Sequence, residues 1–461
     1  MFRVNYHMFS LLPLLTLAQA TPTPPSEEFV RPQEVRPLPG QLDDVLVFNS
    51  NSPEVVQKEG ILLSTFPSTG KRFPTAHLNV PLQGRFDLFA HHIAKATAPD
   101  DLKTLYLGAI LHNPSIRAVT VDILQAASYL SQPDAPFIEL PSYIENSTGS
   151  VYAGPGDRAM NDILRGKRQA DFPAQLVIPP GESRMLLNLP IPVATLDPPI
   201  NGRSTLMRLR SDGPVYLATL GMFARLSNDG SERAPSLEEW ETLLDNGDLS
   251  GPRDRTPTPP DTKTGQVIYS RVAGVAQGST WRSQLVDSPT SQSLTIPQVG
   301  QAFSYGLSTL LAGTLGTTQI QSAPLLARYP DTAYQAHGNY AVEYNLTLPL
   351  VNSTNQPQTV AISLETPLKE DTLSNQGLRF LAPPARQVFF RGSVRIRYND
   401  ERDRPFTQYI HLVQRRGQEG EPLVTLNIPA NHRRLVQVDF LYPPDSTPPQ
   451  VLTVKTLETT N

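Results

Sequence analysis

Cysteine is absent from the 461-residue sequence. The chain therefore forms no disulfide bonds and has no thiolate to bind a metal or attack a substrate. Long apolar runs are also missing after the first 20 residues, where no segment approaches the about 18 continuous apolar residues of a membrane-spanning helix. We therefore expect a protein that is not integral to a membrane.

Motifs of common catalytic chemistry are missing as well. The sequence has no H-E-x-x-H zinc motif, no glycine-rich phosphate loop and no G-x-S-x-G elbow, and the nearest match to the elbow, residues 306–310, lacks the second glycine. Histidines are scattered along the chain, at His77, His91, His92, His112, His337, His411 and His432. Neighbouring His91 and His92 would point to opposite faces of a strand. We predict no catalytic residues, no metal site and no cofactor.

Two kinds of turn come nearest to an ion site. Residues 245–248 and 399–403 are acidic turns that could hold calcium, but Arg402 interrupts the second, and neither follows the twelve-residue calcium loop. Residues 154–157, Gly-Pro-Gly-Asp, come before a short predicted helix at residues 160–165. A plain turn with Asp157 as the helix N-cap explains them without a bound anion.

The first 20 residues have the pattern of an export signal. Arg3 lies in a short basic region, residues 8–17 are apolar, and Ala18 and Ala20 form an A-x-A cleavage site. An uncleaved N-terminal anchor is the alternative. An exported chain without cysteine suits a bacterial envelope better than a eukaryotic secretory route, so we expect the periplasm, the cell surface or the extracellular medium.

Proline is abundant, with 46 residues, and much of it occurs in pairs between short apolar runs. Such pairs punctuate strands, because proline lacks the N–H that helices and central strands require. Residues 340–365 are the clearest example of a strand pattern. Apolar residues alternate with polar ones on both sides of a turn at residues 352–358. We predict a hairpin with one buried face, within an all-β protein.

Three pairs of landmarks suggest an internal duplication. Gly84 and Gly338 are 254 residues apart, Asn113 and Asn352 are 239 apart, and Pro179 and Pro429 are 250 apart. Loop insertions would explain the unequal offsets. Unrelated sandwiches that share strand-turn-strand pieces would give a similar pattern, and this alternative stays open.

The length of the chain favours two domains. We expect a signal peptide (1–20), a proline-rich tether (21–39), a β-sandwich-like domain (40–230), a helix and proline-rich linker (231–264), and a second β-sandwich-like domain (265–461). The linker helix should begin after Ser236, where a capping box precedes an apolar stripe, and end at Gly247.

The most distinctive predicted surface is basic. Residues 379–440 contain 11 arginines, no lysine and 6 acidic residues, whereas the whole chain has a net charge of −4. In the predicted strand 391–398, Arg395 and Arg397 alternate with core residues and should point outward. Arginine without lysine favours bidentate recognition of carboxylate, sulfate or phosphate. The candidate binding residues are Arg391, Arg395, Arg397, Arg415, Arg416, Arg433 and Arg434. A solvated face without a ligand is the alternative.

Three segments carry a family resemblance: PQEVRPLPGQLDDVLVFNSN at residues 32–51, EGILLSTFP at 59–67, and YPDTAYQAHGNY at 329–340. With them, the chain resembles an uncharacterised family of exported cyanobacterial proteins, known as a domain of unknown function. The resemblance implies a photosynthetic bacterium and an envelope or extracellular address, and brings no catalytic residues.

These observations favour a non-catalytic binding or structural protein of the bacterial periplasm or cell surface. Its partner would be an anionic polysaccharide or an acidic envelope protein, and the net charge gives no reason to expect nucleic acid. The alternative is an envelope glycan-active enzyme whose carboxylates come together only in the fold.

Overall fold

The computed structural model describes residues 26–98, 100–262, 265–373 and 376–458. The predicted signal peptide, with Ala18 and Ala20, lies outside these residues. The fold is all-β with two α-helices and one short 3-10 helix in the described residues, as the sequence predicted. The helices are η1 (Pro74–Ala76), α1 (Pro155–Leu164) and α2 (Leu237–Asn246). The strands are β1 (Glu27–Pro32), β2 (Glu34–Arg36), β3 (Leu46–Ser50), β4 (Val55–Val56), β5 (Gly60–Ser64), β6 (Leu82–Lys95), β7 (Leu105–His112), β8 (Val119–Leu130), β9 (Tyr143–Glu145), β10 (Gln175–Ile178), β11 (Ser183–Ile191), β12 (Ile200–Phe223), β13 (Arg225–Leu226), β14 (Glu232–Arg233), β15 (Ala273–Gln277), β16 (Thr280–Gln284), β17 (Leu294–Thr295), β18 (Ala302–Leu307), β19 (Ala323–Arg328), β20 (Gln335–Ala336), β21 (Glu343–Val351), β22 (Gln358–Glu365), β23 (Gly377–Ala382), β24 (Val388–Asn399), β25 (Pro405–Arg415), β26 (Pro422–Ile428), β27 (Arg433–Leu441) and β28 (Gln450–Thr456).

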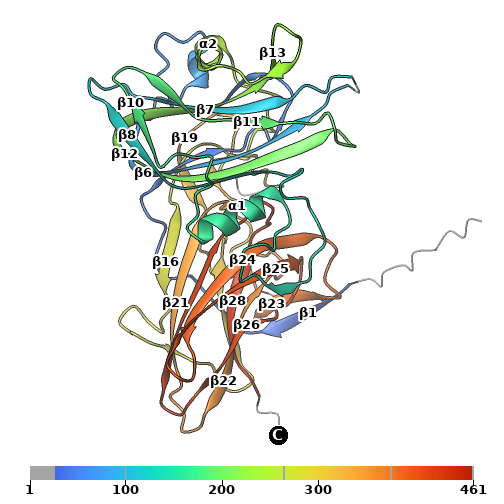
Figure 1. Cartoon of the computed structure of the whole chain (residues 1–461). Coiled ribbons are helices and arrows are strands. Elements are labelled where there is room, and N and C mark those ends of the chain that lie inside the picture. The colour runs from blue at the N-terminus through green and yellow to red at the C-terminus, as the bar shows by residue number, and fades with distance from the viewer. Residues whose placement is uncertain (1–25, 99, 263–264, 374–375, 459–461) are drawn as a thin grey trace, which may run out of the picture.

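The strands form two layered bodies, one above the other in Figure 1. In the lower body, a seven-stranded sheet with β21, β27, β24 and β25 at its centre faces a five-stranded sheet with β18, β28, β22 and β26. In the upper body, the long strand β12 belongs to both layers: it pairs with β6 and β8 in one layer and with β5 and β7 in the other. Each body has its own apolar core, as expected for packed layers of strands.

The predicted alternation is confirmed in β21, whereas residues 360–365 of β22 are buried on both faces, and the predicted hairpin is wrong. Tyr344, Leu346, Leu348 and Leu350 are all at most 1% exposed. However, β21 pairs with β16, β17 and β27, whereas β22 pairs with β26 and β28 in the opposite sheet. The turn therefore carries the chain across the sandwich. Alternation with a period of two determines which face of a strand is buried, but it does not determine which other strand pairs with it.

Three further strand-turn-strand units, β7–β8, β10–β11 and β26–β27, cross between layers in the same way. In the upper body β7 pairs with β11, and β8 pairs with β10. The equivalent pairs in the lower body are β21 with β27, and β22 with β26. The registers match after shifts of 239 and 250 residues: Ser183 lies opposite His112 as Arg433 lies opposite Val351. Each body thus contains the same pair of stacked turns.

Two asparagines make equivalent hydrogen bonds at these turns. Asn113 Nδ2 donates to the carbonyls of Arg117, Ile178 and Pro179, at 2.7, 2.9 and 3.1 Å. Asn352 Nδ2 donates to three carbonyls at 2.8, 2.9 and 3.1 Å, those of Gln356, Ile428 and Pro429. Each asparagine ties its own turn to the neighbouring turn. These matched contacts support a duplicated double turn.

The remaining landmark pair, Gly84 and Gly338, does not take part in the repeat. Gly84 lies in β6, which pairs with β12, whereas Gly338 precedes β21, the equivalent of β7. The repeat that the structure supports therefore comprises four strands in each body, β7, β8, β10 and β11 in one, and β21, β22, β26 and β27 in the other.

Strand pairing crosses the predicted domain boundary near residue 265 in both directions. Strands β15 and β19 join the upper body through β3, whereas β9 pairs with β25 in the lower body. Within the segment predicted as a tether, β1 pairs with β23 and β2 pairs with β18. Phe29 of β1 stacks on Phe380, so burial of aromatic surface accompanies this pairing. The two bodies are thus connected by several passages of the chain.

The two helices have different positions. Helix α2 has the predicted capping box of Ser236 and Glu239 and buries Trp240 on the outer side of the upper body, at the top of Figure 1. Helix α1 lies between the two bodies and begins earlier than predicted. Its N-cap is Gly154, so the prediction that Asp157 is the N-cap is wrong. Asp157 points instead into the lower sheet, where His411 Nε2 lies 2.6 Å from its carboxylate.

Helix α1 fills the junction between the bodies. Met160, Ile163 and Leu164 are buried against Phe89 from the upper body and Leu441 from the lower body. This packing covers the outer face of the central strands of the seven-stranded sheet. None of the helices in the described residues is long and apolar enough to span a membrane.

Candidate functional sites

The structure places two of the predicted arginines at an internal carboxylate. Arg395 Nε and Arg397 Nη2 lie 3.1 and 2.9 Å from Asp439 Oδ2, and the Asp439 side chain is 2% exposed. Arg395 also donates to the Leu164 carbonyl at the end of α1. Both side chains do leave the core face, as predicted. Arg395 is nevertheless engaged with a buried acid and a helix end.

The other predicted arginines separate into three places. Arg391 lies over the ring of Phe137, with its guanidinium carbon 5.4 Å from the ring centroid. Arg415 and Arg416 are exposed at the far end of β25. Along β25, Arg415 is eight residues from Thr407, the residue opposite Arg397, or about 26 Å at about 3.3 Å per residue. The seven arginines therefore do not form one continuous face.

Arg397, Arg433 and Arg434 do come together, in a surface groove of about 300 Å³ at the end of the β24–β25 hairpin. We call this groove the arginine groove. Its lining residues are Arg397, Tyr398, Asn399, Asp403, Pro405, Phe406, Thr407, Arg433, Arg434, Leu435 and Gln437.

The arginine groove combines cationic and apolar surface. Arg433 and Arg434 donate to the backbone carbonyls of Gln292 and Asp400, both at 3.1 Å, and neither forms an ion pair within the described residues. Their remaining N–H groups are available to an incoming anion, because a guanidinium has five donors. Phe406 and Leu435 are 44% and 54% exposed beside them. The groove can therefore bind an anionic group and an apolar group together.

Sequence reasoning identified the three arginines of the groove and missed its apolar side chains. Phe406 is the second residue of β25, which follows the acidic turn 399–403, and Leu435 is an apolar residue on the outward face of β27. An exposed aromatic residue beside a basic cluster was the available signal. The sequence alone does not reveal this signal, because a short apolar run does not show which of its side chains are exposed.

An ionic network continues from Asp439 across the junction. Asn345 Nδ2 donates to Asp439 and to Glu343, at 3.0 and 2.8 Å, and Arg208 of the upper body donates to Glu343 at 2.6 Å. Burial opposes ionisation of Glu343, but Arg208 and the hydrogen bonds outweigh it and hold the pKa of Glu343 below its ordinary value. The network fixes the two bodies relative to each other.

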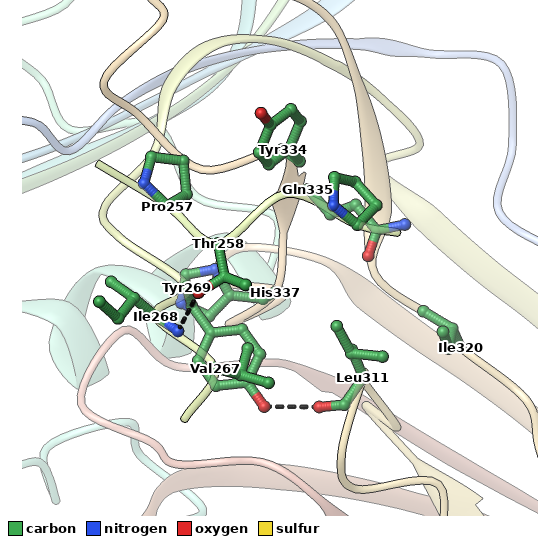
Figure 2. Close-up of a pocket in the computed structure, with 11 residues that line it drawn as sticks. Pro257, Thr258, Val267, Ile268, Tyr269, Leu311, Ile320, Tyr334, Gln335 and His337 are labelled. Carbon is green, nitrogen blue, oxygen red and sulfur yellow. Dashed lines mark hydrogen bonds between the residues drawn. The ribbon is translucent and has the colours of Figure 1, made fainter. Parts of the chain in front are cut away.

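Figure 2 shows a small apolar pocket beside the proline-rich segment that the sequence predicted as a linker. Its volume is about 150 Å³. Tyr269 stacks on His337 with ring centroids 4.9 Å apart, and its hydroxyl donates to the Leu311 carbonyl at 2.5 Å. Thr258 and Ile268 are hydrogen-bonded to each other at 2.8 and 2.9 Å, which folds the segment back on itself beside Tyr269. The linker segment is thus packed against the protein and forms one wall of the pocket.

The remaining candidates have structural partners. His411 and Asp157 are both fully buried, so this pair is closed to a substrate. His91 lies between Glu54 and Ser204 in an order that resembles a catalytic triad, but Ser204 is 0% exposed and cannot attack a substrate. In the described residues no group of three or more acidic or histidine side chains could hold a metal ion.

The fold and the groove define an all-β protein of two layered bodies with an arginine-lined surface site. The chain belongs to the family described as "Protein of unknown function (DUF3370)", whose model matches residues 33–456. None of the curated proteins compared with the chain matches it.

Three solved structures are among those with some similarity. Lac15 from a marine microbial metagenome is 10% identical with a TM-score of 0.10, and the match covers 82% of this chain and 56% of Lac15. The coconut allergen cocosin is 9% identical, with a TM-score of 0.10 and coverage of 88% and 86%. Procruciferin, an 11S globulin from Brassica napus, is 11% identical, with a TM-score of 0.09 and coverage of 87% and 83%. At TM-scores this low, the three structures are not evidence of a shared fold or function.

Proposed function

We propose that this protein is an exported, non-catalytic binding protein of the periplasm or cell surface of a cyanobacterium, and that it docks an anionic envelope polymer in the arginine groove. The observation that carries the proposal is the convergence of Arg397, Arg433 and Arg434 beside exposed Phe406 and Leu435. The export pattern of the first 20 residues supports the address.

Arginine suits this role because its planar group forms paired hydrogen bonds with carboxylate, sulfate or phosphate. Arg433 and Arg434 neighbour each other at the start of β27, and their hydrogen bonds to carbonyl oxygens orient them without neutralising their charge. A repeating anionic polymer could engage both in succession. Its less polar ring or chain surface would contact Phe406 and Leu435.

Binding of a fluorescently labelled dextran sulfate oligomer, followed by anisotropy at about 0.1 M salt, tests the proposal. The double variant Arg433→Ala, Arg434→Ala should weaken binding about tenfold, because each exposed charge pair contributes up to about 1 kcal/mol. The matched control is Arg415→Ala, Arg416→Ala, which removes two exposed arginines outside the groove. Unchanged affinity in the groove variant, or an equal loss in the control, would refute the proposal.

Arg395 and Arg397 are poor positions for this test, although the sequence favoured them. Removing both would leave Asp439 buried without its two cationic partners, which costs several kcal/mol of stability on its own. A loss of binding in that variant would therefore not separate recognition from folding.

A second candidate function, the glycan-active enzyme, is favoured by one other groove. This polar groove of about 630 Å³ lies along the outer side of the five-stranded sheet and is lined by Glu365 and Glu419. Burial raises the pKa of Glu365, whose carboxyl accepts from Thr453 at 2.8 Å. Glu419 forms an ion pair with Arg31 at 2.6 Å. Two carboxyl groups in one groove are the groups that glycoside hydrolysis needs.

Release of reducing ends from envelope polysaccharide tests this second candidate. Glu365→Gln should abolish the release, and Glu182→Gln, an exposed acid of the upper body, should leave it unchanged. Wild-type protein that releases no reducing ends would exclude the hydrolytic function and leave the binding proposal standing.

A further inference from the structure

Two cavities adjoin each other at the junction between the upper and lower bodies. Their volumes are about 250 and 410 Å³, and Glu54 and His91 line both of them. Cavities of this size at the interface of two layered bodies are typical places for small-molecule ligands. The residues come from segments far apart in the sequence, which explains why no sequence motif announces them.

The smaller cavity contains buried oxygen atoms that lack hydrogen-bond donors. Asn49, Asn51 and Asn339 line it and are 3%, 8% and 0% exposed. The side-chain carbonyl oxygen of each has no hydrogen-bond partner within the described residues. A buried unsatisfied acceptor costs about 1–3 kcal/mol, so three in one cavity are a strong reason to expect a donor there.

The larger cavity repeats this chemistry with a carboxyl group. Asp445 lines it, and its Oδ2 atom is enclosed and has no hydrogen-bond partner within the described residues. The charges of His91 and Arg391 lower the pKa of Asp445 through space, and those of Asp157 and Glu54 raise it. Burial is the dominant effect and raises the pKa of Asp445 to about 6. Among the described residues, no cationic side chain forms an ion pair with this carboxyl.

The walls of the larger cavity suit an aliphatic chain. Ile93, Ile200 and Phe137 line it, and Phe137 is 56% exposed at the surface. Glu54, between the two cavities, is hydrogen-bonded to His91 and paired with Arg271, and these contacts lower its pKa to about 2. The site thus offers acceptor oxygens without donors, the Asp445 carboxyl and apolar walls, whereas the charge of Glu54 is already paired with Arg271.

A ligand that satisfies these groups must bring donors and need few acceptors. An ammonium group has three donors and no acceptor, whereas a hydroxyl brings an acceptor with its donor. A cation would also neutralise Asp445, and an aromatic face attracts ammonium groups. We propose that the two cavities form a binding site for a small aliphatic amine, with its charged end at Asp445. This site is independent of the arginine groove and of the function proposed for it.

Calorimetric titration of the full chain at pH 7 with 1,5-diaminopentane tests the proposal, and 1,5-pentanediol serves as the uncharged control of equal length. We expect the diamine to bind at least tenfold more tightly than the diol. Equal binding of the two, or no binding of the diamine, would overturn the proposal.

Variants identify the site within the same experiment. Asp445→Asn keeps the shape of the side chain and removes its charge, and it should weaken diamine binding at least tenfold. Asp171→Asn, an exposed acid that lines neither cavity, is the matched control and should bind as wild type does. Full retention of binding by Asp445→Asn would place the amine elsewhere and overturn the assignment. Thermal unfolding of both variants separates lost binding from lost folding.

Discussion

Replacement of Asn352 by alanine is the sharpest test of the duplicated turns. Asn352 is 0% exposed and makes five hydrogen bonds that tie the β21–β22 turn to itself and to the β26–β27 turn. Asn352→Ala leaves the carbonyls of Ile428 and Pro429 without this donor. The Gln356 carbonyl keeps a bond of 2.9 Å from Thr354 Oγ1.

The expected cost follows from these contacts. Each net hydrogen bond contributes about 1 kcal/mol, and two or three cannot be replaced in the alanine variant, so we expect a loss of about 3 kcal/mol in the free energy of unfolding. Asn352→Asp keeps the two bonds from Thr354 but sets a carboxylate against three carbonyls. It should destabilise at least as much at pH 7 and less at acidic pH.

Urea denaturation of the full chain measures these changes. Asn113→Ala should cost the same as Asn352→Ala within about 1 kcal/mol, because its five contacts are equivalent. The control is Asn399→Ala, an exposed asparagine with one side-chain bond to Asp403, which should change stability by less than about 0.5 kcal/mol. A neutral result at either buried asparagine would refute the reasoning.

Three further predictions concern the junction. Asp445→Asn should raise the free energy of unfolding at pH 7 by about 2 kcal/mol and leave it unchanged near pH 4. The reason is that the unfolded chain ionises this carboxyl above its ordinary pKa, whereas the folded chain keeps it protonated up to a pKa of about 6. Urea denaturation at both pH values measures the effect, and equal effects at both would contradict the prediction. Glu343→Gln should cost about 2 kcal/mol at pH 7, because buried Arg208 loses its nearer carboxylate and keeps only Asp87, 4.0 Å away. In the wild type this contribution is lost as the pH falls through the lowered pKa of Glu343. A pH-independent difference in stability between variant and wild type would be evidence against the ion pair. Asp157→Ala should speed hydrogen exchange of the α1 amides, because it removes the contact with His411; unchanged exchange would show that packing alone holds the helix.

The sequence predicted the strands and the α2 helix well, for local reasons. Alternation at residues 340–365 placed Tyr344 and Leu348 in the core, and the capping box of Ser236 placed the start of α2. Both signals depend on neighbouring residues alone. The pairing partners of the strands were wrong at residues 340–365, because two strands with apolar faces inward can lie in one sheet or in opposite sheets.

The candidate sites depend on contacts that no local pattern contains. Alternation correctly turned Arg395 away from the core, but the sequence could not indicate that Asp439 and the end of α1 lie against it. The sequence pointed to Arg433 and Arg434 only because they lie in an arginine-rich segment. The junction cavities combine residues near positions 50, 91, 339 and 445. Such sites become visible only once the two bodies are packed against each other.

Side-chain NMR of the arginines tests the proposed function most directly. The Nε–Hε signals of the full chain can be followed during titration with a sulfated oligosaccharide and assigned with single Arg→Lys variants. We predict saturable shifts of Arg397, Arg433 and Arg434, and no comparable shift of Arg415 and Arg416. Equal shifts of all exposed arginines, or none in the groove, would contradict the proposal that the arginine groove is the binding site.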